Sequence, residues 1–298
     1  MKKKLVLALV LSLVAPTAHA ATAVKMLGLK PTTSIQLSQN PNDQVSALVT
    51  SSTAIAVVGT SDGVGFISAY DRTATSLSWN LKLGALDSVA TAAVKDPTGD
   101  IWVVGASAVK AEPLATPSIP AGTLNPSGVV PDTSTALPQL KELDIWRVTN
   151  KGVLIKNYTT VMSDVIYPTS ISVKAGKVTV VGAIASHALD QFTITMAADG
   201  TFGTAKISSA KPVAAATQEI KTTLSIWKSF TTSVAIKGLP SWKPKPNSHV
   251  LVRYDAKTKA VIAAYITSGE ILDVAWEKSI GIITLINYPT GYSIAVVK

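Results

Sequence analysis

The sequence repeats a short valine-glycine motif: Val-Val-Gly-Thr at residues 57–60, Val-Val-Gly-Ala at 103–106 and Val-Val-Gly-Ala at 180–183. A tight turn precedes each copy, and β-branched residues after a turn are typical of a β-strand. We expect weaker copies of the same strand at residues 234–238 and 282–287. The recurrence predicts one structural unit that occurs five times along the chain.

The spacing of the copies indicates the size of this unit. Measured at the last glycine or asparagine of each copy, successive spacings are 46, 77, 56 and 49 residues. The long spacing contains a proline-rich insertion at residues 107–139. Without an excess of about 31 residues there, the spacing returns to about 46, the length of one β-propeller blade.

Each unit is expected to contain four strands. In the first unit these lie at 45–50, 53–59, 66–70 and 76–83, with turn residues between them. Four antiparallel strands repeated every 40–50 residues resemble the blade of a β-propeller, which has one twisted sheet per blade. The resemblance is to exported bacterial propellers and rests on the repeat spacing, because the sequence has no WD, kelch or clear Asp-box signature. The predicted fold is an all-β propeller with five blades.

The two ends of the chain are expected to meet in one blade. The fifth unit ends after its third strand at 292–297, and a spare strand at 33–38 precedes the first unit. Because an unpaired sheet edge favours aggregation, we expect the N-terminal strand to complete the last blade. An open stack of sheets, or a β-sandwich with an extra domain, is the alternative architecture.

The first twenty residues have the pattern of a signal peptide. Three lysines at 2–4 precede an apolar run at 5–14, and Ala18-His19-Ala20 fits the small-x-small cleavage rule. We expect cleavage after Ala20, with Ala23 as a second option and an uncleaved anchor as the alternative. The expected domains are therefore a signal peptide at 1–20 and one propeller at 21–298. The predicted location is secreted or extracytoplasmic, without a transmembrane segment after cleavage.

Composition and charge narrow the classes of partner. The chain has no cysteine, so an exported domain must be stabilised by its core and not by disulfides. Without the three lysines of the signal, 24 basic residues face 18 acidic ones, a net charge of +6. This mild basic balance favours an anionic partner, and a solvated basic surface is the alternative reading. No basic run is present, and we expect no nucleic-acid partner.

The sequence has few residues suited to catalysis or metal binding. The predicted mature chain has two histidines, His187 and His249, and it lacks a Gly-x-Ser-x-Gly elbow and a P-loop. We expect no cofactor, no metal site and no catalytic residue. Glycosidase chemistry requires two facing carboxylates, which a ring of blades can supply from distant parts of the chain. The candidates are Asp62, Asp87, Asp164, Asp190 and Glu270.

One face of the predicted propeller is expected to collect the long loops, at residues 107–139, 184–189, 239–247 and 287–291, and we call it the long-loop face. Binding residues concentrate on long loops held by a rigid scaffold. On that face we expect binding by Trp242, Lys243, Lys245, His187 and Tyr288. An aromatic ring beside two cations can contact a sugar or an anionic polymer. Alternatively, Trp242 packs on its neighbours in a proline-stiffened loop.

These observations favour a noncatalytic binding or scaffold module. The expected partner is an anionic cell-wall polymer, a carbohydrate or an extracytoplasmic protein, which the long-loop face contacts. A propeller hydrolase or lyase that uses carboxylates on the same face is the alternative. An oxidoreductase similar to quinoprotein propellers is less consistent with the sequence, because the repeated tryptophan motifs of those proteins are absent.

Overall fold

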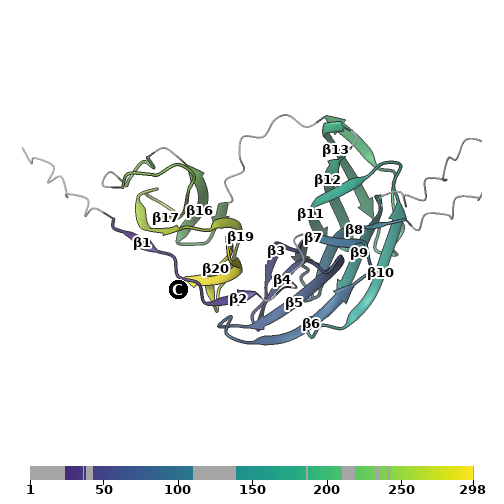
Figure 1. Ribbon diagram of the computed structural model, residues 1–298, viewed down its shortest axis with the longest axis horizontal. Helices are drawn as coiled ribbons and strands as arrows, with labels where there is room; N and C mark the ends of the chain where they lie inside the picture. The colour runs from purple at the N-terminus through teal and green to yellow at the C-terminus, as the bar shows by residue number, and fades with distance from the viewer. Residues whose placement is uncertain are drawn as a thin grey trace, which may run out of the picture.

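A computed structural model describes residues 24–35, 37, 43–109, 139–185, 187–209, 219–232, 235–239 and 242–297. These residues form five β-sheets and no helix, and the sheets follow one another around an arc (Figure 1). The predicted signal peptide and residues 110–138 of the proline-rich insertion lie outside the described residues.

The five sheets are the five predicted blades. The first contains β3 (Gln44–Thr50), β4 (Ala54–Ser61), β5 (Val64–Asp71) and β6 (Leu77–Leu83). The second contains β7 (Ser88–Lys95), β8 (Ile101–Ala108), β9 (Leu140–Val148) and β10 (Leu154–Val161). The third contains β11 (Ile166–Lys174), β12 (Lys177–Ile184), β13 (His187–Met196) and β14 (Lys206–Ser209).

The last two blades include strands from the N-terminal segment. The fourth contains β15 (Glu219–Lys221), β16 (Ser225–Thr232), β17 (Ser248–Asp255), β18 (Val261–Thr267) and, parallel to β18, β1 (Met26–Gly28). The fifth contains β19 (Glu270–Glu277), β20 (Gly281–Tyr288), β21 (Gly291–Val297) and β2 (Thr33–Ile35). All other neighbouring strands in the five sheets are antiparallel.

The closing strand is confirmed. β2 pairs with β21 and covers the open edge of the fifth blade, with Ser34 opposite Ser293 and Ile35 opposite Tyr292. The pairing of β1 with the fourth blade is not expected from the sequence. The N-terminal segment therefore joins the fourth and fifth sheets as well as closing the last one.

The glycine of the repeated motif lies opposite a β-bulge in the neighbouring innermost strand. In the second blade the register shifts between Ala90 and Ala92, and a Cβ atom on Gly105 would lie 1.8 Å from the carbonyl oxygen of Val89. Gly59 and Gly182 are crowded in the same way, at 2.1 Å and 2.6 Å from a carbonyl oxygen of the innermost strand. The motif therefore marks the point where a bulge brings two backbones too close for a side chain.

The prediction that the weak fourth copy of the motif is a strand is wrong. The second strand of the fourth blade is β16 (Ser225–Thr232), whereas residues 235–239 form a loop with a turn at Lys237 and Gly238. Leu239 at the end of this loop is fully buried against the sheet. The apolar residues of this loop cover the face of the blade, and for this reason the segment has the apolar pattern of a strand. The fifth copy is correct and lies in β20.

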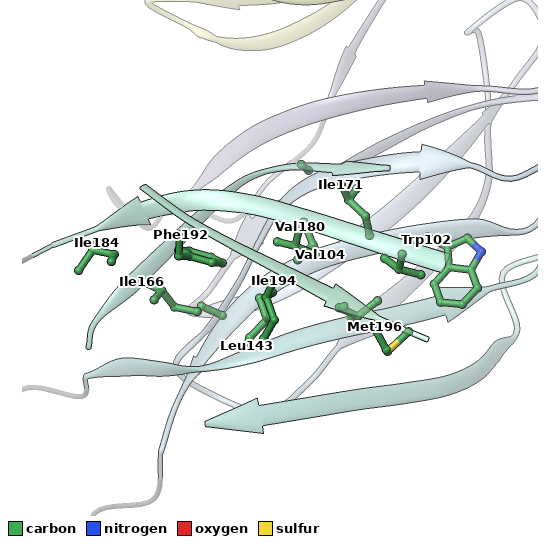
Figure 2. Packing of buried hydrophobic residues seen from close by; sticks show 14 residues of the cluster. Trp102, Val104, Leu143, Ile166, Ile171, Val180, Ile184, Phe192, Ile194 and Met196 are labelled. Atoms are coloured by element: carbon green, nitrogen blue, oxygen red, sulfur yellow. The ribbon is translucent and has the colours of Figure 1, made fainter. Parts of the chain in front are cut away.

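Apolar side chains fill the spaces between neighbouring blades. Between the second and third blades, residues such as Trp102, Ile171, Phe192 and Met196 form one buried cluster (Figure 2). The innermost strands pack in the order β19, β3, β7 and β11, and β16 packs on β19. Among the described strands no comparable packing joins the third and fourth sheets, which lie on either side of the open part of the arc (Figure 1).

Candidate functional site

A cavity of about 600 Å³ opens on the long-loop face, where the innermost strands β3, β7 and β11 begin. Its lining residues come from four blades, and most are polar or aromatic. They are Asp43, Gln44, Thr60, Gly63, Asp87, Ser88, Val89, Leu140, Tyr167 and Tyr292. Because equivalent strand starts meet at this position, the propeller repeat itself brings residues together that are up to 249 positions apart, as for Asp43 and Tyr292.

Local hydrogen bonds hold the two carboxylates in different ways. Asp43 accepts bonds from Ser61 Oγ at 3.1 Å and from the backbone N–H of Asp62 at 2.6 Å, so it fixes the turn between β4 and β5. Asp87 is exposed and has a left-handed backbone, with φ of 63°. Its carbonyl accepts a bond from the backbone N–H of Ala108 at 2.9 Å. Asp87 therefore presents a carboxylate to solvent from a fixed backbone position.

The two tyrosines supply flat surfaces in the cavity. Burial raises the pKa of Tyr292; a hydrogen bond with the backbone of Val45 opposes this rise, and the nearby carboxylates of Asp43 and Glu270 add to it. Its hydroxyl therefore stays protonated at neutral pH and can donate a hydrogen bond. Tyr167 is 43% exposed and presents its ring to solvent.

The cavity has a negative character. Its lining includes two aspartates and no lysine or arginine among the described residues. A carboxylate accepts hydrogen bonds from hydroxyl groups, whereas it repels other anions. The arrangement therefore suits a neutral, hydroxyl-rich ligand better than an anionic polymer.

The predicted binding residues on the fourth blade lie away from this cavity. Trp242 is half-buried and packs on a cluster that includes Leu239 and Val250. Lys243 and Lys245 are exposed beside it, and the backbone of Lys245 is held by Ser248 at 2.8–3.2 Å. The loop therefore matches the alternative interpretation, in which the tryptophan packs on its neighbours.

The other two predicted binding residues lie on different blades. Tyr288 ends β20, is partly buried, and its hydroxyl accepts a bond from Thr267 Oγ1 at 3.0 Å. His187 begins β13, and its side chain lies outside the described residues. The structure thus distributes the five predicted residues over three blades and does not bring them together at the described cavity.

Sequence reasoning identifies one member of the cavity and misses the others. Asp87 is among the candidate carboxylates, whereas Gln44, Tyr167 and Tyr292 are not among the predicted site residues. The signal that could find them is positional, because each is the first or second residue of its strand. An alignment of strand starts across the five units would place them on one rim.

The described residues contain no group of histidine and acidic side chains with the geometry of a metal site. In the same part of the chain, there is no helix with the length and hydrophobicity needed to cross a membrane.

Comparisons with known proteins give weak similarities to solved structures. No protein-family model and no curated protein matches the sequence. Among solved structures, a protein of unknown function from Bacteroides caccae has 8% identity over 82% of this chain and 71% of its own, with a TM-score of 0.37. The Dos1 propeller has 9% identity over 87% of this chain and 69% of its own, with a TM-score of 0.36. The assignment as a five-bladed propeller rests on the strand order and pairing described above.

Proposed function

We propose that this protein is an exported, noncatalytic binding module and that the cavity on its long-loop face binds a neutral carbohydrate. The observation that carries the proposal is the composition of that cavity, which combines exposed aromatic and hydrogen-bonding side chains with two carboxylates. The signal-peptide pattern at residues 1–20 supports a location outside the cytoplasm.

The chemistry of the lining favours a sugar over the other expected partners. Sugar rings stack on exposed aromatic rings, and their hydroxyl groups bond to carboxylates and amides such as those of Asp87 and Gln44. An anionic cell-wall polymer would bring negative charge toward Asp43 and Asp87. Among the expected partners, the carbohydrate is the best match to the cavity.

Binding of neutral oligosaccharides tests this proposal. The chain from Ala21 onward would be titrated with a panel of cello-, malto- and chito-oligosaccharides by isothermal titration calorimetry. We expect at least one to bind, and Tyr167→Ala to weaken it about tenfold through loss of stacking. Ile207→Ala is the matched control, because Ile207 is exposed on the outer strand of the same blade. Failure of the whole panel to bind would overturn the carbohydrate assignment.

A hydrolase is the second candidate, because Asp43 and Asp87 line one cavity. The hydrogen bonds of Asp43 to the β4–β5 turn argue against it, since both of its carboxylate oxygens are already engaged. Release of reducing ends from the same panel would be measured with the wild type and with Asp87→Asn. We expect no release from either protein. Release by the wild type that Asp87→Asn abolishes would establish the hydrolase instead.

A further inference from the structure

A second pocket, of about 400 Å³, lies on the opposite face between the fourth and fifth blades. The short turns that follow β15 and β19 border it, so it belongs to the face with the short turns. Two tryptophans and two cations dominate its lining: Trp227, Trp276, Arg253 and Lys278. No carboxylate is among its described lining residues.

The second blade also contains a tryptophan beside an arginine, and there an aspartate pairs with the arginine. Trp102 stacks on Tyr158 at 5.9 Å, and the guanidinium of Arg147 lies 5.2 Å from the Trp102 ring. Asp100 then binds this arginine through two contacts, 2.9 Å from Nε and 2.7 Å from a terminal nitrogen. The carboxylate satisfies the fork of donors that an arginine presents.

The fourth blade repeats the aromatic and cationic parts of this arrangement. Trp227 stacks on Tyr265 at 6.2 Å, and the guanidinium of Arg253 lies 5.5 Å from the Trp227 ring. The registers also agree, because Trp227 is opposite Arg253 just as Trp102 is opposite Arg147 in the second blade. The two clusters therefore occupy equivalent positions in their sheets.

The acid is missing from the fourth blade. Asp100 lies two residues before Trp102, and the position two residues before Trp227 is Ser225. The Ser225 hydroxyl accepts a bond from Trp227 Nε1 at 3.1 Å. Within the described part of the chain, Arg253 forms no ion pair, and its buried Nε has no hydrogen-bond partner. Arg253 itself lines the pocket, so its guanidinium can pair there with an acceptor supplied from outside.

We propose that this pocket binds a carboxylate carried on a ring, such as an acidic sugar unit. The ligand carboxylate would take the role that Asp100 has in the second blade and pair with Arg253, while Lys278 adds positive charge at the rim. The ring would stack on Trp276, which is 42% exposed, and the hydroxyls of the turn at 222–225 would bond to its substituents. This site is on the other face from the carbohydrate cavity and does not depend on it.

The test uses the chain from Ala21 onward with three small probes: glucuronate, benzoate and glucose. Tryptophan fluorescence and calorimetry would follow binding at low and high salt. We expect glucuronate to bind, with an affinity that falls as salt rises, and glucose not to bind. Tight binding of benzoate would support the carboxylate-on-a-ring chemistry with an apolar ring. Equal binding of glucose, or no binding of either carboxylate, would overturn the proposal.

A single substitution in the fourth blade can supply the carboxylate that Arg253 lacks. Ser225→Asp places a carboxylate at the position of Asp100, and we expect it to weaken glucuronate binding at least tenfold and to raise the unfolding temperature. Ser52→Asp adds the same charge to the corresponding turn of the first blade and should leave binding unchanged.

Arg253→Gln is a second variant that should also abolish binding. Undiminished binding by folded Ser225→Asp and Arg253→Gln proteins would overturn the proposal, and Tyr167→Ala should have no effect here.

Discussion

Two buried aspartates show how the surroundings of one residue decide its charge. Asp96 is 7% exposed, and burial alone would raise its pKa. Bonds from Thr98 at 2.6 and 2.8 Å, from Trp102 Nε1 at 2.9 Å and from the N–H of Asp100 outweigh burial and lower its pKa. Asp144 is 3% exposed, and burial raises its pKa despite bonds from Ser107 at 2.6 Å and Asn157 at 3.2 Å.

The raised pKa of Asp144 predicts a specific dependence of stability on pH. Burial is its main cause, and Glu142 adds to it. A carboxyl whose folded pKa is raised favours folding below its unfolded pKa, and this contribution is lost as pH rises through the folded value. We therefore expect Asp144→Asn to be neutral or stabilising by up to about 1 kcal/mol at pH 7, because it removes a buried charge.

The sign of this effect should reverse toward low pH. Thermal unfolding of wild type and Asp144→Asn would be compared as the pH falls from 7 into the acidic range, because the raised pKa makes Asp144 protonate at a higher pH than an ordinary aspartate. The wild type should regain stability relative to the variant over this range. A variant that is equally destabilised at every pH would show that the carboxylate is needed for its hydrogen bonds and that its charge costs nothing.

At the scale of the strand, the β-bulge in the innermost strand requires the glycine of the motif in the second strand. The bulge in the innermost strand brings its carbonyl toward the second strand, and only glycine leaves room there. The same bulges lie near the starts of β3, β7 and β11, where the long-loop cavity is built. The motif therefore shapes the rim of the site as well as the sheet.

Substitution of a motif glycine tests whether the bulge requires glycine at this position. A methyl group at Gly105 would lie 1.8 Å from a backbone oxygen and 2.8 Å from the ring of Trp146. We expect Gly105→Ala to lower the free energy of unfolding by about 2–4 kcal/mol, because the backbone must move to make room.

Urea denaturation measures this change, and Gly28→Ala is the control. Gly28 lies in β1 and lacks a positive φ, and a methyl group added there would have no neighbouring atom within 4 Å. Its replacement should therefore change stability by less than about 0.5 kcal/mol. Equal effects of the two substitutions would contradict the role assigned to the motif.

At the scale of the whole molecule, the N-terminal segment joins the fourth sheet to the neighbouring fifth sheet. β2 completes the fifth blade and β1 extends the fourth, so a short segment contacts two sheets far along the chain. Leu29 and Ile35 of this segment are buried in the clusters that join neighbouring blades. The segment thus contributes to packing between blades as well as to edge protection.

Removal of this segment should destabilise the molecule. A chain that begins at residue 38 would lose β1 and β2 and leave the edge of β21 unpaired. We expect its unfolding temperature to fall by at least about 5 °C and its tendency to aggregate to rise. A chain that begins at residue 24 is the matched control, and a synthetic peptide of residues 24–37 should restore part of the loss. An unchanged unfolding temperature would show that β2 is dispensable for closure.

Local patterns in the sequence were sufficient for the five units, the closing strand β2 and most of the other strands, but not for β1 or for the second strand of the fourth blade. Alternation of apolar residues, turn residues and the recurrence of the motif depend on near neighbours in the chain, and β2 followed from counting strands per unit. The weak fourth copy of the motif is misplaced: among its described residues, 235–238, Ile236 packs on the sheet instead of forming part of it. A local pattern does not distinguish these two ways of burying side chains.

The two candidate sites were decided by the tertiary structure. Asp43 and Tyr292 meet because their strands begin on one rim, and their sequence positions are far apart. Arg253 lacks an acid because Ser225 stands where the second blade has Asp100, a comparison that needs the register of both sheets. The sequence by itself determined the repeat, which arises from short-range periodicity, and the strand that completes the last blade, which follows from counting the strands in each repeat. Only the folded chain decided which side chains converge, since that depends on strand register, bulges and packing between blades.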